Sequence, residues 1–179
     1  MFRHDLPGGA SLRLFEEADA DELFSRVAAN RSYLERWLPW VESTHDPEPI
    51  LEFIRMARMQ VADNNGFQAA IVEDGRIVGA VGFHGVDWKN ESTSIGYWLA
   101  EDHQGRGTMT AAVRALVDHA FSVWKLNRVE IRAAVGNTKS RAIPERLGFS
   151  KEGVLRKSER IGGRYEDSVV YSMLAEGWL

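Results

Sequence analysis

The sequence predicts one mixed α/β domain of the α+β kind, extending over residues 1–179. Its 179 residues, 44% of them hydrophobic, are enough to bury a single core. Stretches that alternate apolar and polar residues take turns along the chain with stretches of helical period. We find no linker, low-complexity tract or internal repeat. The order of elements is strands, helix, strand, helix and strands around one sheet.

The first third predicts a short strand and two helices. "SLRLF" from Ser11 reads as a strand. A helix is expected to begin near Asp19, because acidic residues crowd its first turn, where the helix dipole favours them. Pro39 ends the segment "YLERWLPW", and a second helix is expected over about residues 47–62.

The next segment predicts three strands. "GFQAAIVEDGRIVGAVGFH" reads as two strands joined at Asp74 and Gly75, since glycine accepts the positive φ of a tight hairpin turn. "STSIGYWLA" is a further strand, whose side chains alternate between two faces. One face carries Ile95, Tyr97 and Leu99, and the other carries Gly96 and Trp98.

The second half opens with the clearest helix of the chain. Eight apolar residues fall at helical spacing, which predicts about four turns with one buried face. They are Met109, Ala112, Val113, Leu116, Val117, Ala120, Phe121 and Trp124.

The last elements are a strand, a short helix and a hairpin. "RVEIRAAV" from Arg128 alternates as a strand does. A short helix is expected over 141–147, closing on Gly148, with Pro144 either in its early turns or kinking it. Two final strands, near 154–160 and 165–174, flank the turn "IGGR".

Composition excludes several classes of function. A net charge of −4 argues against a nucleic-acid partner. The absence of cysteine removes disulfides, thiolate metal sites and a cysteine nucleophile, and the five histidines lack ligand spacing, so no metal is expected. No apolar run has the length of a signal sequence or a membrane span. We therefore expect a soluble, cytoplasmic protein without a membrane partner.

A short loop with Gly105 and Gly107 lies between the predicted strand and the long helix. Such a loop presents several unpaired backbone N–H groups at a helix N-terminus, which is an anion site suited to phosphate. The alternative is that the glycines only make a tight connection, and the loop by itself favours neither. It matches neither the Walker A spacing nor the dinucleotide fingerprint.

The segment "QGRGTM", residues 104–109, resembles the pyrophosphate loop of the GNAT N-acetyltransferases, Gln/Arg-x-x-Gly-x-Gly/Ala. "IGYWLAEDHQGRGTMTAA", "NRVEIRAAVGNTKSRAIPERLGF" and "GGRYEDSVVYSML" resemble its RimJ/RimL-type branch, which acetylates ribosomal-protein N-termini. The similarity extends over nearly the whole chain. It implies a single GNAT-type domain with a mixed, mostly antiparallel sheet flanked by helices, and a splayed strand pair at the cofactor cleft.

The resemblance implies acetyl-CoA as the cofactor, released as CoA, and assigns residues to it. The backbone near Tyr97, Trp98 and Leu99 is expected to hold the pantetheine arm. Asn137 is expected to contact the cofactor, and Ser140 to lie near the thiol as a proton donor, although both residues are also good helix caps. The expected pyrophosphate loop consists of Gln104, Gly105, Arg106, Gly107, Thr108, Met109 and Thr110.

The general base is left open by the sequence. Ser94 stands where relatives of this branch often have an acid. His84 and Asp87, at the end of a strand that should border the cleft, are candidates, and water is the alternative. Deprotonating an α-amine at neutral pH costs about 1.4 kcal/mol and a lysine about 4.6 kcal/mol. Weak base machinery therefore favours an N-terminal α-amine as acceptor.

Trp37 and Trp40, followed by Glu42, Asp46 and Glu48, are the candidate acceptor site. Aromatic walls with an acidic rim would suit a cationic peptide end, whereas the alternative is that the tryptophans are core or homodimer contacts and the acids are solvated. The predicted activity is direct acetyl transfer to a protein N-terminus. The alternatives are a small-molecule amine such as an antibiotic or polyamine, and a non-catalytic acetyl-CoA sensor.

Overall fold

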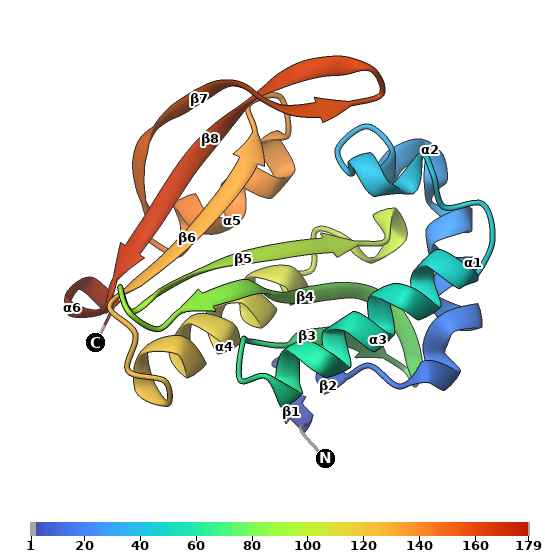
Figure 1. The fold of residues 1–179 in the computed structure, drawn as a ribbon, viewed down its shortest axis with the longest axis horizontal. Helices are drawn as coiled ribbons and strands as arrows, with labels where there is room; N and C mark the ends of the chain where they lie inside the picture. Colours follow the sequence, from blue (N-terminus) through green and yellow to red (C-terminus); the bar gives the residue numbers. More distant parts are fainter. Residues whose placement is uncertain (1–2, 179) are drawn as a thin grey trace.

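The computed structural model describes residues 3–178, which form one eight-stranded sheet with the strand order β1-β2-β3-β4-β5-β6-β8-β7 (Figure 1). All neighbouring strands are antiparallel except β5 and β6, which run parallel, so the expected mixed, mostly antiparallel sheet is confirmed. The strands are β1 (Arg3–Asp5), β2 (Ser11–Leu14), β3 (Gln68–Glu73), β4 (Arg76–Asp87), β5 (Ser92–Leu99), β6 (Arg128–Ala134), β7 (Ser150–Ile161) and β8 (Arg164–Leu174).

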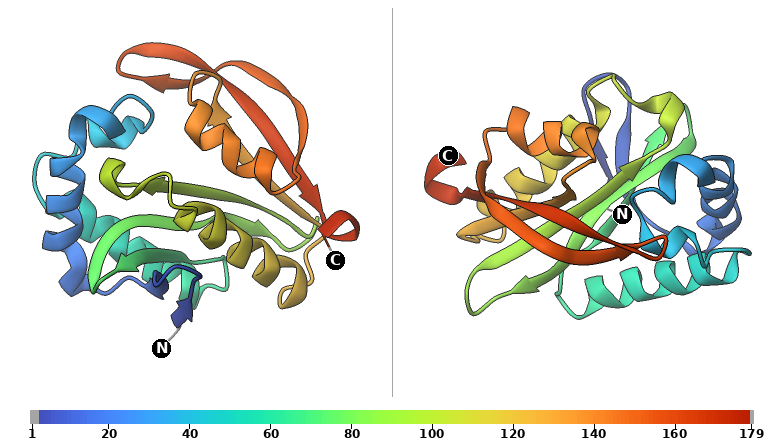
Figure 2. Two further views of the ribbon diagram at one scale, coloured as in Figure 1. Left: turned by 180° about the vertical axis from the view of Figure 1, so that it is seen from behind. Right: turned by 90° about the horizontal axis from the view of Figure 1, so that it is seen from above.

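Helices cover both faces of the sheet. Helices α4 and α5 lie on one face and α1 and α3 on the other, as the view from behind shows (Figure 2). None of the helices within residues 3–178 is long and apolar enough to cross a bilayer. The helices are α1 (Ala20–Ala29), α2 (Arg31–Leu34), α3 (Glu48–Ala62), α4 (Thr108–Ser122), α5 (Thr138–Arg146) and α6 (Ala175–Trp178).

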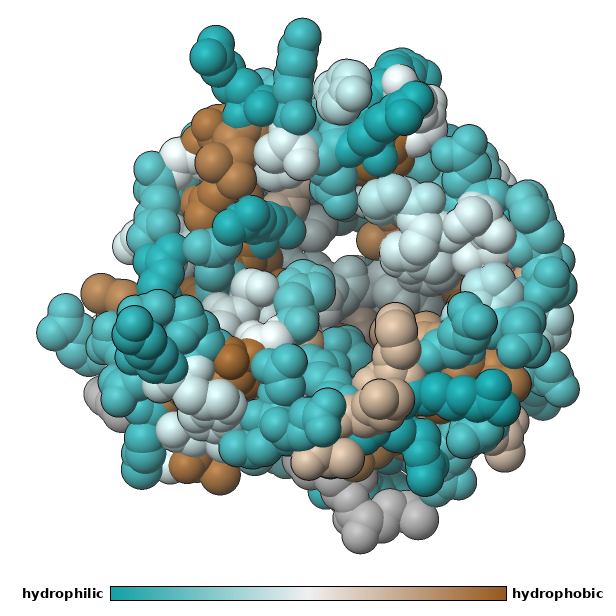
Figure 3. All heavy atoms as spheres, viewed as in Figure 1, coloured by the Kyte–Doolittle hydropathy of each residue, from teal (hydrophilic) through white to brown (hydrophobic). Residues whose placement is uncertain are grey.

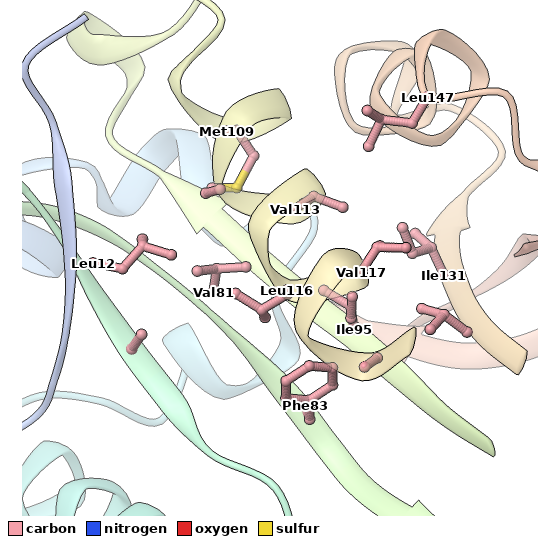
Figure 4. Close-up of a cluster of buried hydrophobic side chains, with 14 of the residues drawn as sticks. Leu12, Val81, Phe83, Ile95, Met109, Val113, Leu116, Val117, Ile131 and Leu147 are labelled. Carbon is pink, nitrogen blue, oxygen red and sulfur yellow. The ribbon is translucent and has the colours of Figure 1, made fainter. Parts of the chain in front are cut away.

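The larger core lies between α4 and the sheet. Leu116 of α4 points toward Val81 of β4, and Val117 points toward Ile131 of β6 (Figure 4). This confirms the apolar stripe predicted for the long helix. A second core on the opposite face joins the sheet to α1 and α3 through Leu23 and Ile54, among other residues.

Strands β5 and β6 part after four paired positions. Their register begins at Ser92↔Arg128 and ends at Ile95↔Ile131. Beyond that point β5 stays paired only with β4, and β6 only with β8. The sheet therefore divides into two halves that separate toward the carboxyl ends of β5 and β6, as expected for a splayed pair.

Several details differ from the sequence prediction or decide what it left open; among them, α2 and α6 were not expected, and β7 begins at Ser150 rather than near Val154. Strand β1, only three residues long, was not expected. Helix α5 begins at Thr138 rather than at Arg141, because Asn137 caps it with its side chain. Pro144 lies inside this helix, at its seventh residue, and not in the first turn, where proline is best tolerated.

A partly buried ion pair links β2 to Asp19, the residue that precedes α1. Arg13 of β2 donates to both carboxylate oxygens of Asp19, at 2.7 and 2.8 Å, and Asp19 also accepts the Glu16 N–H at 2.8 Å. Burial alone would raise the pKa of Asp19, but the hydrogen bonds from Arg13 and Glu16 and the charge of Arg13 lower it below its ordinary value.

We expect Asp19→Asn to lower the free energy of unfolding by about 2 kcal/mol at pH 7, because the half-buried Arg13 loses its charged partner. A carboxyl with a lowered folded-state pKa stabilises above its unfolded pKa of about 3.9, and this contribution is lost as the pH falls through the folded value. Urea unfolding at pH 7 and pH 3 measures both effects. The difference between variant and parent should shrink at pH 3, and a constant difference would contradict the assignment.

Candidate active site

A cavity of about 950 Å³ opens where β5 and β6 part. The face of the molecule seen in Figure 1 is hollowed near its middle (Figure 3). The lining includes Leu34 and Leu38 from the α1 side of the sheet and Ala111 and Ala115 of α4 from the other side. The cavity therefore connects the two faces of the sheet through the gap between its halves.

One wall of the cavity is the N-terminus of α4. Gly107 is the N-cap and has a left-handed φ of 84°, as Gly105 does at 78°. The first hydrogen bond of α4 runs from the Ala111 N–H to the Gly107 carbonyl. Within residues 3–178, the N–H groups of residues 105–110 have no backbone acceptor. A Cβ added at Gly105 or Gly107 would meet no atom within 4 Å. Free donors and open space make a fitting anion site.

The carboxylate of Glu73 holds the loop before α4 through hydrogen bonds. Glu73, the last residue of β3, accepts from the Thr108 hydroxyl at 2.9 Å and lies 2.7 Å from His103 Nδ1. Burial opposes the ionisation of Glu73, but hydrogen bonds from His103 and Thr108 and the charge of Arg106 lower its pKa. The loop is therefore attached to β3 as well as to β5.

Three cations line the cavity at the α4–α5 end: Arg114, Lys139 and Arg146. Arg146 also donates to the Thr110 hydroxyl at 2.8 Å. Two carboxylates, Glu101 and Asp118, line the cavity as well. The cations add positive charge beside the free N–H groups, and the sequence reasoning missed them because they come from helix faces rather than from the loop.

Arg106, predicted within the phosphate loop, is not among the lining residues of this cavity. Its side chain is 61% exposed, donates to the Asp102 carbonyl at 2.8 Å and lies 3.8 Å from Glu73. Arg141 of α5 is not a lining residue either; it donates to the Tyr171 hydroxyl and to the Val135 carbonyl. Both side chains therefore make structural hydrogen bonds: Arg106 within the loop before α4, and Arg141 from α5 to β8 and to the end of β6.

Gln104 contributes to the cavity through its side chain. Its own N–H donates to the Glu101 carbonyl, while Nε2 donates to the Leu99 carbonyl at 3.0 Å. Its Oε1 accepts from Tyr33 of α2 at 3.2 Å and from Lys139 of α5 at 3.1 Å. Gln104 thus joins α2, β5 and α5 across the cavity mouth.

The structure separates the roles of Asn137 and Ser140 that the sequence left open. Asn137 is the N-cap of α5, and its side chain accepts the Ser140 N–H at 3.2 Å. Ser140 is the third residue of the helix, in its first turn, and lines the cavity, and its hydroxyl has no hydrogen-bond partner within residues 3–178. Asn137 therefore caps the helix and also lines the cavity, where the expected cofactor contact stays a prediction, while the Ser140 hydroxyl has no partner among the described residues.

The cavity is lined by Tyr97, Trp98 and Leu99. All three follow Ile95, the last residue of β5 that pairs with β6. Their main-chain groups on the β6 side have no strand partner. The Tyr97 hydroxyl donates to the Ser140 carbonyl at 2.9 Å, and burial raises the Tyr97 pKa well above its ordinary value.

The opposite mouth of the cavity has aromatic walls. Trp37 lines it, and its ring would lie 3.4 Å from a Cβ added at Gly136. Trp40 is not a lining residue; its ring packs 6.3 Å from that of Trp98, and the residue is 38% exposed. The predicted acidic rim stays at the exposed positions Glu42, Asp46 and Glu48. Trp37 alone of the predicted pair reaches the cavity.

His84 and Asp87 lie outside the main cavity. His84 Nδ1 is 3.0 Å from Ser94 Oγ, and its ring occupies the space that a side chain at Gly96 would fill. Burial of the ring and the charge of Arg132 lower the His84 pKa, although the residue keeps contact with solvent. Asp87 accepts from Asn90 and lines a separate, smaller hollow.

Glu159 was not singled out by the sequence. It lies on β7 directly opposite Glu166 of β8, and, like His84 and Asp87, neither glutamate is a lining residue of the main cavity. The register β8–β6–β5 places Glu166 on the same face of the sheet as Ser168, Ser94 and Trp98. Burial raises the pKa of Glu159, whereas hydrogen bonds lower those of Glu73 and Glu152.

A β-bulge immediately precedes Glu159. Leu155 pairs with Ser168 and Glu159 with Glu166, so residues 156–158 lie opposite Asp167 alone. The bulge is fixed by the Lys157 N–H, which donates to the Asp167 carboxylate at 2.8 Å. Bulges near functional sites re-aim the following side chains. No short motif in the sequence signals such a register change, which is why Glu159 was missed.

Comparison with known proteins agrees with this architecture. The sequence profile of the acetyltransferase (GNAT) domain family matches residues 11–150. The chain is 41% identical to Bacillus subtilis YdaF, provisionally named a ribosomal N-acetyltransferase, over 99% of this chain and 98% of that protein. It is 26% identical to the ribosomal-protein-serine acetyltransferase of Escherichia coli over 92% of each chain.

Among solved structures, the chain resembles Mycobacterium smegmatis RimJ in complex with CoA-disulfide. The TM-score is 0.89 and the identity 28%, covering 98% of this chain and 87% of that one.

We expect Gly107→Ala to lower the melting temperature by about 2–4 °C. A Cβ costs about 1 kcal/mol at a left-handed position even though no atom obstructs it. Gly153→Ala is the matched control, because that glycine also has open space around its Cβ but no left-handed φ. Thermal unfolding of both variants tests the backbone assignment, which equal melting temperatures would refute.

Proposed function

This chain belongs to the GNAT family and is an acetyl-CoA-dependent N-acetyltransferase, and we propose that its acceptor is the N-terminal α-amine of a protein, a ribosomal protein foremost. The observation that carries the proposal is the cavity that joins the two faces of the sheet. A donor can enter from the α4–α5 side and a peptide end from the side of Trp37 and Trp98.

The residues at the α4 end fit the phosphates of acetyl-CoA. The free N–H groups of 105–110 would hold the pyrophosphate, with Arg114, Lys139 and Arg146 nearby. The unpaired edge of β5 from Tyr97 to Leu99 would receive the pantetheine arm through main-chain hydrogen bonds. Bound there, acetyl-CoA supplies a thioester carbonyl activated for direct attack by an amine.

Ser140 is the proposed proton donor. Its hydroxyl lines the cavity, makes no other hydrogen bond within residues 3–178, and lies in the first turn of a helix capped by Asn137. The helix N-terminus favours negative charge, so it would stabilise an oxygen or thiolate that gains electron density there. No covalent intermediate on the chain is required, which agrees with the absence of cysteine.

Glu159 is the proposed general base. Its raised pKa, the bulge before it and its place on the Trp98 face support this role. Glu166 beside it adds negative charge that would attract a protonated amine. His84 remains the competing prediction, since its lowered pKa keeps the ring neutral at pH 7.

The α-amine is favoured over lysine by its lower pKa. Deprotonating an α-amine at pH 7 costs about 1.4 kcal/mol, whereas deprotonating a lysine costs about 4.6 kcal/mol. A single partly buried carboxylate therefore has less work to do with an α-amine. The Escherichia coli relative, a ribosomal-protein-serine acetyltransferase, supports a ribosomal protein as the acceptor. The Trp37 side chain, which lines the cavity on the proposed acceptor side, would suit a peptide terminus.

We expect a peptide with a free N-terminal serine or alanine to be acetylated at least tenfold faster at pH 7 than the same peptide with a blocked N-terminus and one internal lysine. Thiol release measured with a chromogenic disulfide is a clean assay, because the chain contributes no thiol of its own. Spermidine serves as the small-molecule comparison. A preference for lysine or spermidine would overturn the proposed acceptor. If no amine leads to thiol release, the result would favour a sensor role.

We expect Glu159→Gln to lower kcat/KM about 100-fold at pH 7, because glutamine keeps the size of the side chain but cannot accept a proton. In the parent, kcat/KM should rise with pH through the Glu159 pKa, and the variant should lose this rise. His84→Gln, measured in parallel, distinguishes the two bases: a large loss there, with Glu159→Gln nearly unaffected, would assign the role to His84.

A further inference from the structure

Pro144 leaves one carbonyl of α5 without its helical donor. Proline has no N–H, so the carbonyl four residues earlier, that of Ser140, receives no hydrogen bond from within the helix. Main-chain carbonyls away from water are nearly always paired. Here the donor is the Tyr97 hydroxyl, 2.9 Å away, from strand β5. The Ser140 carbonyl, which the helix leaves unpaired, is thus the acceptor of the Tyr97 hydroxyl.

Tyr97 stands at the point where the sheet divides. It lies two residues beyond Ile95, the last residue of β5 that pairs with β6, and its ring packs against the larger core. On its other side α5 is held by Arg141, which donates to the Val135 carbonyl at 2.9 Å and to the Tyr171 hydroxyl of β8 at 3.0 Å. The first turn of α5 is therefore attached to both halves of the sheet.

The other links from α5 toward the first half of the sheet are weaker constraints on Ser140. Lys139 reaches Gln104, and Arg146 reaches the Thr110 hydroxyl, through exposed and flexible side chains. Arg146 ends on α4, and Lys139 reaches β5 only indirectly, through the Gln104 side chain that donates to the Leu99 carbonyl. The Tyr97 bond is made by a partly buried side chain whose ring packs against the larger core, and it goes directly to the main chain of Ser140.

We propose that Tyr97 and Pro144 together position Ser140 relative to the unpaired edge of β5. This inference rests on the role of Ser140 in the proposed function. Tyr97 acts through Ser140 and is a positioning residue. The fixed hydroxyl-to-carbonyl bond sets the separation of the two cavity walls at the place where the proton donor stands.

The test compares the parent with Tyr97→Phe, Pro144→Ala and the double variant. Tyr97→Phe removes only the hydroxyl, so we expect kcat to fall about tenfold and the melting temperature of the ligand-free protein to fall by about 3 °C. Pro144→Ala restores a main-chain N–H at the seventh residue of α5, and this donor can supply the Ser140 carbonyl. In that background the same Tyr97→Phe change should cost about 1 °C or less.

The loss of kcat on Tyr97→Phe should remain about tenfold in the Pro144→Ala background, because the restored helix bond does not connect α5 to β5. The dissociation constant for CoA, measured by calorimetry, should change less than threefold. Tyr165→Phe, at a 63% exposed tyrosine on β8, is the matched control and should change neither quantity. Activity is measured with whichever amine the parent acetylates fastest.

Two results would overturn the inference: a kcat for Tyr97→Phe within twofold of the parent, or recovery of kcat together with stability in the double variant. The second result would mean that Tyr97 is only structural. Equal melting-temperature losses in both backgrounds would show that Pro144 does not free the carbonyl for Tyr97. The melting temperatures do not depend on acetyl transfer, so a parent enzyme without activity would count against the proposed function and leave this coupling measurable.

Discussion

The loss of pairing between β5 and β6 after Ile95↔Ile131 is the constraint on which the rest of the site depends. A sheet cannot divide in a protein interior without leaving main-chain donors and acceptors that need other partners. Each half keeps one complete ladder, β5 with β4 and β6 with β8, so only the two inner edges lack pairing. Those edges face a cavity large enough for an extended ligand that can supply the missing hydrogen bonds.

The same parting explains why two helix N-termini meet at one place. Because β5 and β6 are parallel, their carboxyl ends lie at the same edge, and the helices that follow them, α4 and α5, both begin there. The start of α4 leaves its first N–H groups free and becomes an anion site. The start of α5 is capped by Asn137 and presents the Ser140 hydroxyl. One topological feature therefore provides both the seat for phosphate and the place for a proton donor.

The sequence predicted most of what local chemistry decides. The apolar stripe of α4 and the Asp74–Gly75 turn, with positive φ at both residues, follow from spacing and residue type. What depends on register was not visible. Glu159 follows a bulge at 156–158 that no periodicity predicts, and His84 was expected near the cleft although its ring lies over Gly96, outside the cavity. The pairing of the Ser140 carbonyl with Tyr97 joins residues 43 positions apart, so only the folded structure reveals it.

The distribution of charge about the cavity also depends on the divided sheet. The chain as a whole is acidic, yet Arg114, Lys139 and Arg146 line the cavity at the α4–α5 end. Glu159 and Glu166 are not lining residues, but they lie on the Trp98 face of the sheet. Under the proposed function, an anionic donor would be attracted to the cations at the α4–α5 end, and a cationic amine to the acids on the other face of the sheet. Because the cavity joins the two faces through the gap between β5 and β6, the two reactants can approach from different sides and still meet.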